Sequence, residues 1–375
     1  MRLMTALALA VMLVVDTHGQ SQSTQPPSGK NPFLKLTEPW PDARTLRQRR
    51  AAAEALRLFA SEEPIEFTLA VDLKKVNKDR DPNSKKKYPA QLETTAERGA
   101  VRTIPVIVNA RGHLRRNARV CDHVPLKLTL PASQMQGTPF QGQEGVKLVV
   151  QCRSNRSSEQ DLLKEYLAYR VMNVLTPRSF RARLAKVTYR DPAGPPLGTR
   201  YGMVLEDADD VARRLNGRQV EVPRMPFNSL HRETLDAMML FQYLLGNTDF
   251  SIYALHNVVL VQAADRTMYP VPYDFDISGL VRPPYARPDR RLPIRDVTER
   301  LYRGPCRSVE ELQAALAPFL AQRDRILALP GTIADLNEGS RNDSRKYLND
   351  FYGAVESGKD LKRLFIDGCI QAISM

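Results

Sequence analysis

The sequence predicts an α+β protein whose sheet-rich first half precedes a helix-rich second half. From residue 61 to 206, short runs that alternate between apolar and polar residues are separated by turn residues, which is typical of an antiparallel sheet. From residue 207 to 375, apolar residues recur mostly at helical spacing, with one pair of strand-like runs between the helices. The 375 residues, 42% of them hydrophobic, suffice for one large or two modest domains.

The first 19 residues have the layout of a secretory signal peptide. Arg2 gives a positive start, and residues 3–15 form an apolar run that is too short to span a bilayer comfortably. Residues 17–19 provide a plausible cleavage site. No second long apolar run follows. We therefore expect an exported protein, periplasmic, at the cell surface or secreted, without stable membrane insertion. The alternative is an N-terminal membrane anchor.

The chain has 4 cysteines, an even number, which in an oxidising compartment suggests two disulfides. Of the three pairings, we favour the one in which each pair falls within one region of the chain. These pairs are Cys121 with Cys152 and Cys306 with Cys369. Zinc binding is the alternative, but no two cysteines have the close Cys-x-x-Cys spacing.

The formal net charge of +13 allows attraction to nucleic acid, anionic membrane or acidic protein. The basic residues are scattered in short clusters, at 47–50, 85–87 and 115–119, and match no nucleic-acid-binding module. A solvated basic surface explains them, and we expect no specific nucleic-acid partner.

Residues 20–60 are expected to form a linker rich in Ser, Gln, Pro and Gly, and then a helix that Asp42 caps. The charged stretch 74–88 reads as a turn-rich connection. One long helix is expected at 157–175, capped by Ser157 or Ser158. The expected strands of the first half are 65–73, 102–112, 124–131, 145–153, 181–192 and 199–207.

The second half is expected to open with a strongly apolar helix at 230–246. Two strands, 257–261 and 268–273, then make a hairpin with Asn257 and Asp274 at its edges. Two further helices are expected at 308–329 and 345–365.

Polar residues that suit phosphoryl transfer follow one another in this layout. Lys147 lies on a strand and Glu165 on the next helix, whereas Asp249, Asn257 and Asp274 come after the apolar helix. Transfer from a nucleotide needs a lysine on the phosphates, an acid near the acceptor hydroxyl, and oxygen ligands for magnesium. Spacing alone leaves simpler roles open for these residues: a turn cap, a hairpin residue, an exposed edge strand or a surface ion pair.

The segments GNTDFSIYALHN at 246–257 and YPVPYDFD at 269–276 resemble the CotH family of atypical protein kinases. The resemblance extends upstream through 111–130, 161–189 and 201–214, and covers roughly residues 105 to 282. Asp-Phe-Asp in this context is its most specific part. The resemblance implies a kinase-like two-lobed fold with an antiparallel sheet N-lobe and a mostly helical C-lobe, and some members are secreted.

The resemblance also implies residue roles. Asp249 is similar to the catalytic Asp. Asn257 and Asp274 are similar to metal-binding residues, with Asp276 in support. Lys147 is the candidate phosphate lysine with Glu165 as its partner, Lys127 competes with Lys147, and Glu206 falls near the kinase hinge. The implied cofactors are ATP and Mg²⁺ or Mn²⁺, and the implied acceptor is a protein hydroxyl.

The sequence departs from the family pattern at three points. Phe250 and Ser251 stand where many atypical kinases carry a basic residue or His. The spacing from Asp249 to Asn257 is longer than the Asp-x-x-x-x-Asn of typical protein kinases. No clean Gly-rich loop is present. A catalytically inactive, pseudokinase-like binding scaffold at the cell envelope is therefore the alternative function, and metal-dependent phosphoester hydrolysis is a third.

Overall fold

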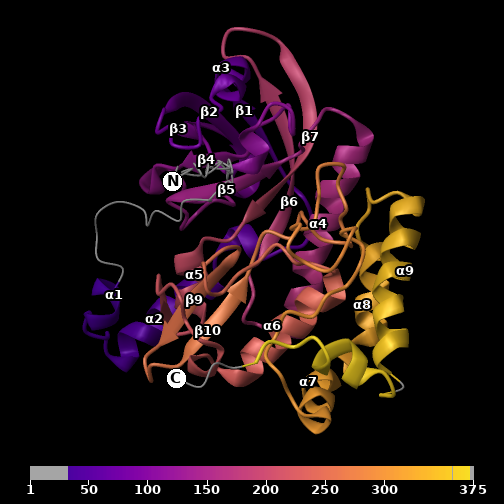
Figure 1. The fold of residues 1–375 in the computed structure, drawn as a ribbon. Helices are drawn as coiled ribbons and strands as arrows, with labels where there is room; N and C mark the ends of the chain where they lie inside the picture. The colour runs from indigo at the N-terminus through magenta and orange to yellow at the C-terminus, as the bar shows by residue number, and fades with distance from the viewer. Residues whose placement is uncertain (1–32, 357, 372–375) are drawn as a thin grey trace, which may run out of the picture.

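The computed structural model describes residues 33–356 and 358–371, and confirms the α+β class. The predicted signal peptide lies outside these residues. The first half of the chain closes into a seven-stranded barrel with the strand order β1-β2-β3-β4-β5-β7-β6 (Figure 1). The strands are β1 (Ile65–Ala70), β2 (Tyr88–Thr95), β3 (Val101–Ala110), β4 (Leu126–Thr129), β5 (Gly145–Val150), β6 (Ala182–Arg190) and β7 (Pro196–Leu205).

The barrel differs from the expected antiparallel sheet where it closes. All neighbouring strands are antiparallel except β1 and β6, which pair in parallel. Closure removes the exposed edges that an open sheet would present. The interior is filled by alternate apolar side chains of the strands, among them the fully buried Leu69, Leu92, Val108, Leu128, Leu148 and Val187.

Strand β2 and the short helix α3 (Leu73–Lys78) lie where the sequence predicted only a turn-rich connection and its flank. In β2 the inward positions are Ala90, Leu92 and Thr94, so only one large apolar residue marks the strand. The three lysines at 85–87 precede it directly. The alternation that reveals a half-buried strand is therefore weak here.

Helix α4 (Arg156–Leu175) runs between the barrel and the C-terminal helices, touching β6 and β7 on one side and α8 and α9 on the other (Figure 1). Its buried residues lie on more than one face: Leu163, Leu167 and Val171 share one face at a spacing of four residues, whereas Tyr166 and Tyr169 lie on another. The cap is Asn155, whose side chain accepts from the Ser158 N–H, and neither predicted serine serves as cap. Helix α2 (Ala43–Glu54) has the predicted cap, Asp42.

The second half contains the expected strand pair, β9 (Val258–Ala263) and β10 (Met268–Pro272), in antiparallel register. A third strand, β8 (Gly217–Val220), extends it on the β9 side. The sequence of β8, Gly-Arg-Gln-Val, carries no apolar alternation, which explains why it was not predicted. The apolar helix α6 (Arg232–Leu245) lies against β10, and α5 (Ala208–Arg214) against β8 and β9.

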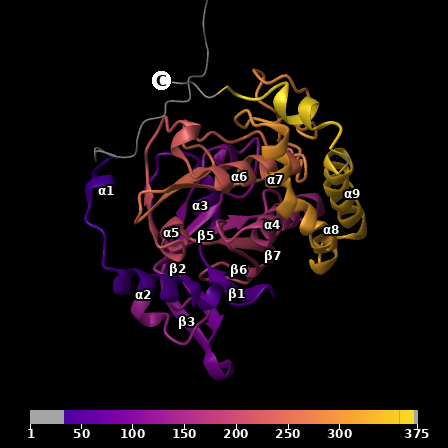
Figure 2. The ribbon, with the colours of Figure 1, turned by 90° about the horizontal axis from the view of Figure 1, so that it is seen from below.

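The C-terminal region forms three helices, α7 (Val309–Ala321), α8 (Arg323–Thr332) and α9 (Glu338–Val355), where two were expected (Figure 2). The break comes at Gln322, whose N–H bonds to the carbonyls of both Pro318 and Phe319 and so tightens the last turn of α7. A short π-helical turn, Lys362–Ile366, follows α9.

Both disulfides form with the favoured pairing. Cys121–Cys152 joins the segment before β4 to the β5–α4 connection, and Cys306–Cys369 joins the segment before α7 to the C-terminal segment. Two disulfides are consistent with a location outside the cytoplasm. Within the described ranges, no helix is long and apolar enough to cross a membrane.

Candidate functional site

Asp249 is positioned by the turn that ends α6. Gly246 has φ +62°, and a Cβ there would lie 2.1 Å from the Tyr347 hydroxyl oxygen, so the turn requires glycine. Asn247 is buried; its Nδ2 donates to Gln242 Oε1 (2.9 Å) and its Oδ1 accepts from the Asp249 N–H (2.9 Å). The side chain that fixes this turn is therefore Asn247, which leaves the Asp249 carboxylate for other contacts.

The Asp249 carboxylate is held by two neighbours that follow it in the chain. His256 Nε2 lies 3.0 Å from Asp249 Oδ1, and Asn257 Nδ2 donates to Asp249 Oδ2 (3.2 Å) and to the Asp249 carbonyl (2.8 Å). The hydrogen bond to Asp249 raises the pKa of His256 above its ordinary value. His256 was not among the predicted site residues, because a lone histidine in the sequence carries no spacing signal.

Asn257 and Asp274 share an unusual backbone conformation at the end of the β9–β10 pair. Their φ angles are +54° and +61°, in the left-handed region that costs most residues energy but that Asn and Asp adopt comparatively well. The Tyr273 N–H donates to the Asn257 carbonyl (3.0 Å), which continues the ladder between the two segments. Left-handed non-glycine residues of this kind cluster at functional sites.

The predicted Asp-Phe-Asp segment is anchored on helix α4. Phe275 is fully buried, with its ring 4.7 Å from that of Tyr169 and 5.2 Å from that of Phe241, measured between centroids. The Tyr169 hydroxyl oxygen accepts from the Asp274 N–H (2.9 Å). Phe275 is thus buried in the core, and Asp274 and Asp276 stand on either side of it, next to helix α4. Glu165 lies on the same helix, one turn before Tyr169.

Three carboxylates, Glu165, Asp274 and Asp276, form an acid cluster at this point. Burial, together with the charges of Asp276 and Asp274, raises the pKa of Glu165 well above its usual range. Burial and the nearby Asp274 raise the pKa of Asp276 to about 7. The Tyr285 hydroxyl donates to Asp276 Oδ2 (2.8 Å). Buried acids that raise one another's pKa are typical of functional sites.

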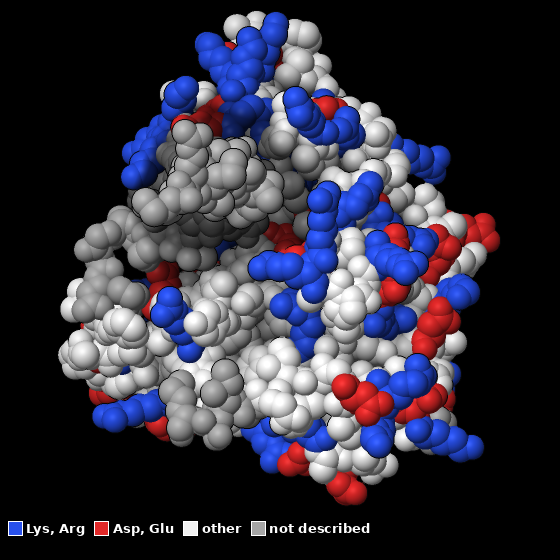
Figure 3. Space-filling model, in the orientation of Figure 1, with Lys and Arg blue, Asp and Glu red and all other residues white. Residues whose placement is uncertain are grey.

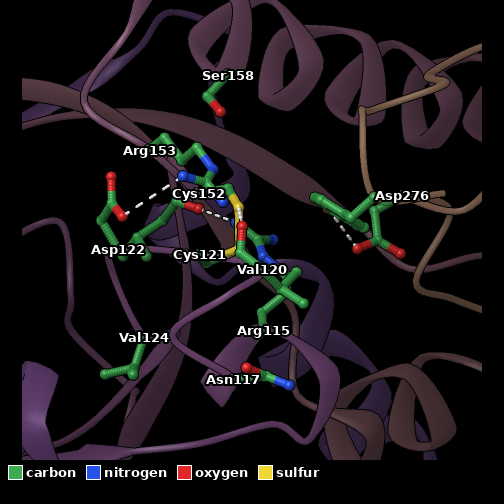
Figure 4. Close-up of a disulfide and its surroundings, with 12 residues drawn as sticks. Arg115, Asn117, Val120, Cys121, Asp122, Val124, Cys152, Arg153, Ser158 and Asp276 are labelled. Carbon is green, nitrogen blue, oxygen red and sulfur yellow. Dashed lines mark hydrogen bonds and ion pairs between the residues drawn. A yellow bond between two sulfur atoms is a disulfide. The ribbon is translucent and has the colours of Figure 1, made fainter.

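Arg115 is the cation that faces the acid cluster. Its Nη1 lies 4.0 Å from Glu165 Oε2. Burial alone would lower the pKa of Arg115, but the charges of Tyr285, Glu165 and Asp276 carry it above its ordinary value. Figure 4 shows Arg115 beside the Cys121–Cys152 disulfide, with Asp276 nearby. No local pattern indicated this role, because Arg115 belongs to a run of basic residues that is typical of a solvated surface.

The predicted partnership of Lys147 with Glu165 is not among the ion pairs of the described residues. Lys147 Nζ lies 3.9 Å from Asp207 Oδ2, and burial lowers its pKa. Lys127 lies directly opposite Lys147 in the β4–β5 register and is exposed. The two candidate phosphate lysines are thus adjacent, and Glu165 faces Arg115 instead.

Glu206, the predicted hinge residue, is fully buried and its carboxylate is fully engaged. Arg181 donates to it through its backbone N–H (2.9 Å), Nε (3.0 Å) and Nη2 (2.7 Å). Arg214 donates through Nε (2.8 Å) and Nη2 (2.9 Å). Both carboxylate oxygens accept hydrogen bonds from arginines. The Glu206 side chain therefore stabilises the fold by holding Arg181 and Arg214.

The predicted metal ligands have suitable chemistry but do not form a ready metal centre. Asp274, Asp276 and Asn257 offer the oxygen atoms that Mg²⁺ prefers, and the bonds that Asn257 donates through Nδ2 leave its Oδ1 available. In the part of the chain that the structure describes, however, no group of three or more His, Cys, Asp or Glu side chains is arranged to hold a metal ion. A magnesium site made of two aspartates, the Asn257 amide oxygen and nucleotide phosphates is a different ligand set, and it stays a prediction.

Comparison with protein-family models and with curated proteins finds no match for this chain. The likeness to CotH kinases therefore stays a prediction from sequence motifs, and the functional argument depends on the site itself.

Proposed function

We propose that the protein is an exported, kinase-like phosphotransferase that passes the terminal phosphoryl group of ATP, supplied with Mg²⁺ or Mn²⁺, to a hydroxyl group on a protein. The observation that carries the proposal is the Asp249 carboxylate, fixed by His256 and Asn257 within the electrostatic reach of the acid cluster. The charges of Asp274 and Asp276 contribute to the raised pKa of His256, and that of Asp249 to the raised pKa of Asp276.

In the proposed reaction, Asp249 orients the acceptor hydroxyl and accepts its proton as the new O–P bond forms. The bond between the γ-phosphorus and the β–γ bridging oxygen breaks, and ADP leaves with the electron pair. Asn257 and His256 restrict the rotation of the Asp249 carboxylate, which lowers the entropic cost of that orientation. Lys147, with Lys127 beside it, supplies positive charge for the phosphates.

The test is transfer of labelled γ-phosphate by the mature protein, to itself or to a mixture of exported proteins. Asp249→Asn should lower the rate by about 10²–10⁴-fold, the usual contribution of a positioned general base. The matched control is Asp265→Asn, at an exposed turn aspartate that accepts from the Thr267 N–H. Equal rates in wild type and Asp249→Asn would contradict the assigned role.

The second candidate function is a catalytically inactive binding scaffold. It is favoured by the engagement of Glu165 with Arg115 and of Lys147 with Asp207, which takes both residues away from the kinase pairing. On the face in Figure 3, Lys and Arg side chains spread over the top and the right, with Asp and Glu among them. A scaffold that binds acidic partners through this charge would lose affinity steeply with added salt, whereas phosphoryl transfer would be absent at any salt concentration.

A further inference from the structure

The acid cluster brings three carboxyl groups together, and the cation that pairs with it is Arg115. Glu165 and Asp276 are 3% and 6% exposed, whereas Asp274 is half-buried. None of the described residues gives the Asp274 carboxylate a hydrogen bond or an ion pair. Buried carboxylates without compensation are costly, so such a cluster holds a cation or keeps protons.

Arg115 lies on a segment that hydrogen bonds, an ion pair and a disulfide hold in place. Its Nη2 donates to the Val150 carbonyl. The next residue, Arg116, is buried in an ion pair with Asp79 (2.8 Å). Arg80 donates to the carbonyls of Arg116 (3.1 Å) and Cys121 (3.0 Å). The Cys121–Cys152 disulfide then ties the same segment to the β5–α4 connection (Figure 4). The guanidinium is therefore held in place by the fold and not by the acids alone.

The guanidinium also stands at a small cavity beside the acids. Its lining includes Arg115, Ser158, Asp161, Glu165, Asp276 and Tyr285. Asp161 has an ion pair of its own with Lys164 (3.2 Å), a residue outside this lining, whereas the ion pair of Glu165 is with Arg115. Arg115 Nε has no hydrogen-bond partner among the described residues, and Arg115 Nη1 lies 4.0 Å from Glu165 Oε2, beyond hydrogen-bond distance. Its main interaction with the cluster is thus its positive charge.

We infer that Arg115 is a built-in counter-cation that takes the place of a divalent metal in the acid cluster, so that removal of the guanidinium creates a site for Mn²⁺ or Mg²⁺. Truncation to alanine enlarges the cavity and leaves Glu165, Asp274 and Asp276 without a counter-charge. A divalent cation then relieves their repulsion and draws the carboxylates together. A guanidinium in this position accounts for why these carboxylates, within the described ranges, are not arranged to hold a metal ion.

The test measures binding of Mn²⁺ alone to the mature protein, by electron paramagnetic resonance of the free ion and by thermal unfolding. We expect Arg115→Ala to bind one Mn²⁺ at least 100-fold more tightly than the wild type, and Arg115→Ala/Asp276→Asn to lose that binding. The matched control is Arg153→Ala. Arg153 is an exposed arginine near the same disulfide, and it forms an ion pair with Asp122. It should bind Mn²⁺ as weakly as the wild type. No nucleotide is present, so the outcome does not depend on phosphoryl transfer.

A second measurement keeps the inference testable if Arg115→Ala is too unstable for binding studies. Asp276→Asn removes one of the charges that Arg115 balances, so the double variant Arg115→Ala/Asp276→Asn should melt at a higher temperature than Arg115→Ala. Either of two results overturns the inference: Mn²⁺ binding by the wild type that matches Arg115→Ala, or a double variant that melts below Arg115→Ala.

Discussion

At the scale of single residues, the site depends on side chains that restrain one another. Asp249 is fixed by Asn257 and His256, and the Asp274 backbone by Tyr169. Asp249, His256 and Asn257 lie on one connection, between α6 and β9, whereas Tyr169 reaches Asp274 from helix α4. A substitution in this network is therefore expected to change the geometry of the site more than the stability of the fold.

The hydrogen bond between His256 and Asp249 predicts a pH dependence. Because Asp249 raises the pKa of His256, the folded protein holds this proton more tightly than the unfolded chain does. The stabilisation is fully present below about pH 6.5, the value of an unperturbed histidine, and is lost as the pH rises through the raised pKa. Histidine titration followed by NMR should give His256 a pKa above 6.5, and Asp249→Asn should lower it. A pKa unchanged by that substitution would contradict the contact.

Glu206 was expected near a nucleotide, but in the fold it is buried and bound by two arginines. Its carboxylate joins Arg181, at the start of β6, to Arg214 of α5, and Arg181 Nη2 also donates to the Ala53 carbonyl of α2 (2.7 Å). Glu206 and Arg181 together therefore connect the barrel with helices α5 and α2.

We expect Glu206→Gln to destabilise the fold by about 3–5 kcal/mol, because it leaves two partly buried arginines without their counter-charge. Denaturant unfolding measures this change. Glu221→Gln, at a residue that lies exposed after β8, is the control and should change stability by less than about 0.5 kcal/mol. A loss below about 1 kcal/mol in Glu206→Gln would contradict the structural role.

At the scale of elements, the sequence identified those that bury a continuous apolar face. Helices α4 and α6 and the pair β9–β10 have many large apolar residues at regular spacing. Strands β2 and β8 have few large apolar residues, because their neighbours in the sheets supply most of the packing. Barrel closure by the parallel pair β1–β6 also escaped prediction, since it joins segments far apart in the sequence.

The same difference applies to the candidate site. Asp249, Asn257, Asp274 and Asp276 lie close together in the chain, and their apolar surroundings made them recognisable. Arg115, Tyr169 and Tyr285 reach the site only through tertiary contacts, so no local pattern could indicate them. For the same reason the sequence suggested Lys147 as the partner of Glu165, whereas the fold brings Arg115 to it.

At the scale of the whole molecule, two hydrophobic clusters account for the core that the described residues form. One fills the barrel, and the other lies between α4, α6, the β8–β9–β10 sheet and the C-terminal helices. The Cys306–Cys369 disulfide encloses helices α7, α8 and α9 and fastens the end of the chain, where the Cys306 N–H donates to the Ile370 carbonyl (3.1 Å).

Removal of this disulfide tests its share of the stability. The closed loop has a sequence separation of 63, for which the chain-entropy model predicts a loss of about 4 kcal/mol in Cys306→Ala/Cys369→Ala. Chemical denaturation without reductant measures the loss. The wild type in reductant serves as a second comparison, and unchanged stability in the double variant would contradict the contribution assigned to the disulfide.

The central claim is that the molecule holds a nucleotide at the site of Asp249 and Asp274. It is tested most directly by thermal unfolding of the mature protein with and without ATP and Mg²⁺, with Asp274→Ala measured alongside. A ligand that binds only the folded state should add about 2.7 kcal/mol at 100 times its dissociation constant. We predict a rise in melting temperature that requires both ATP and Mg²⁺ and is lost in Asp274→Ala. No rise in the wild type, or an equal rise in both proteins, would contradict the nucleotide site.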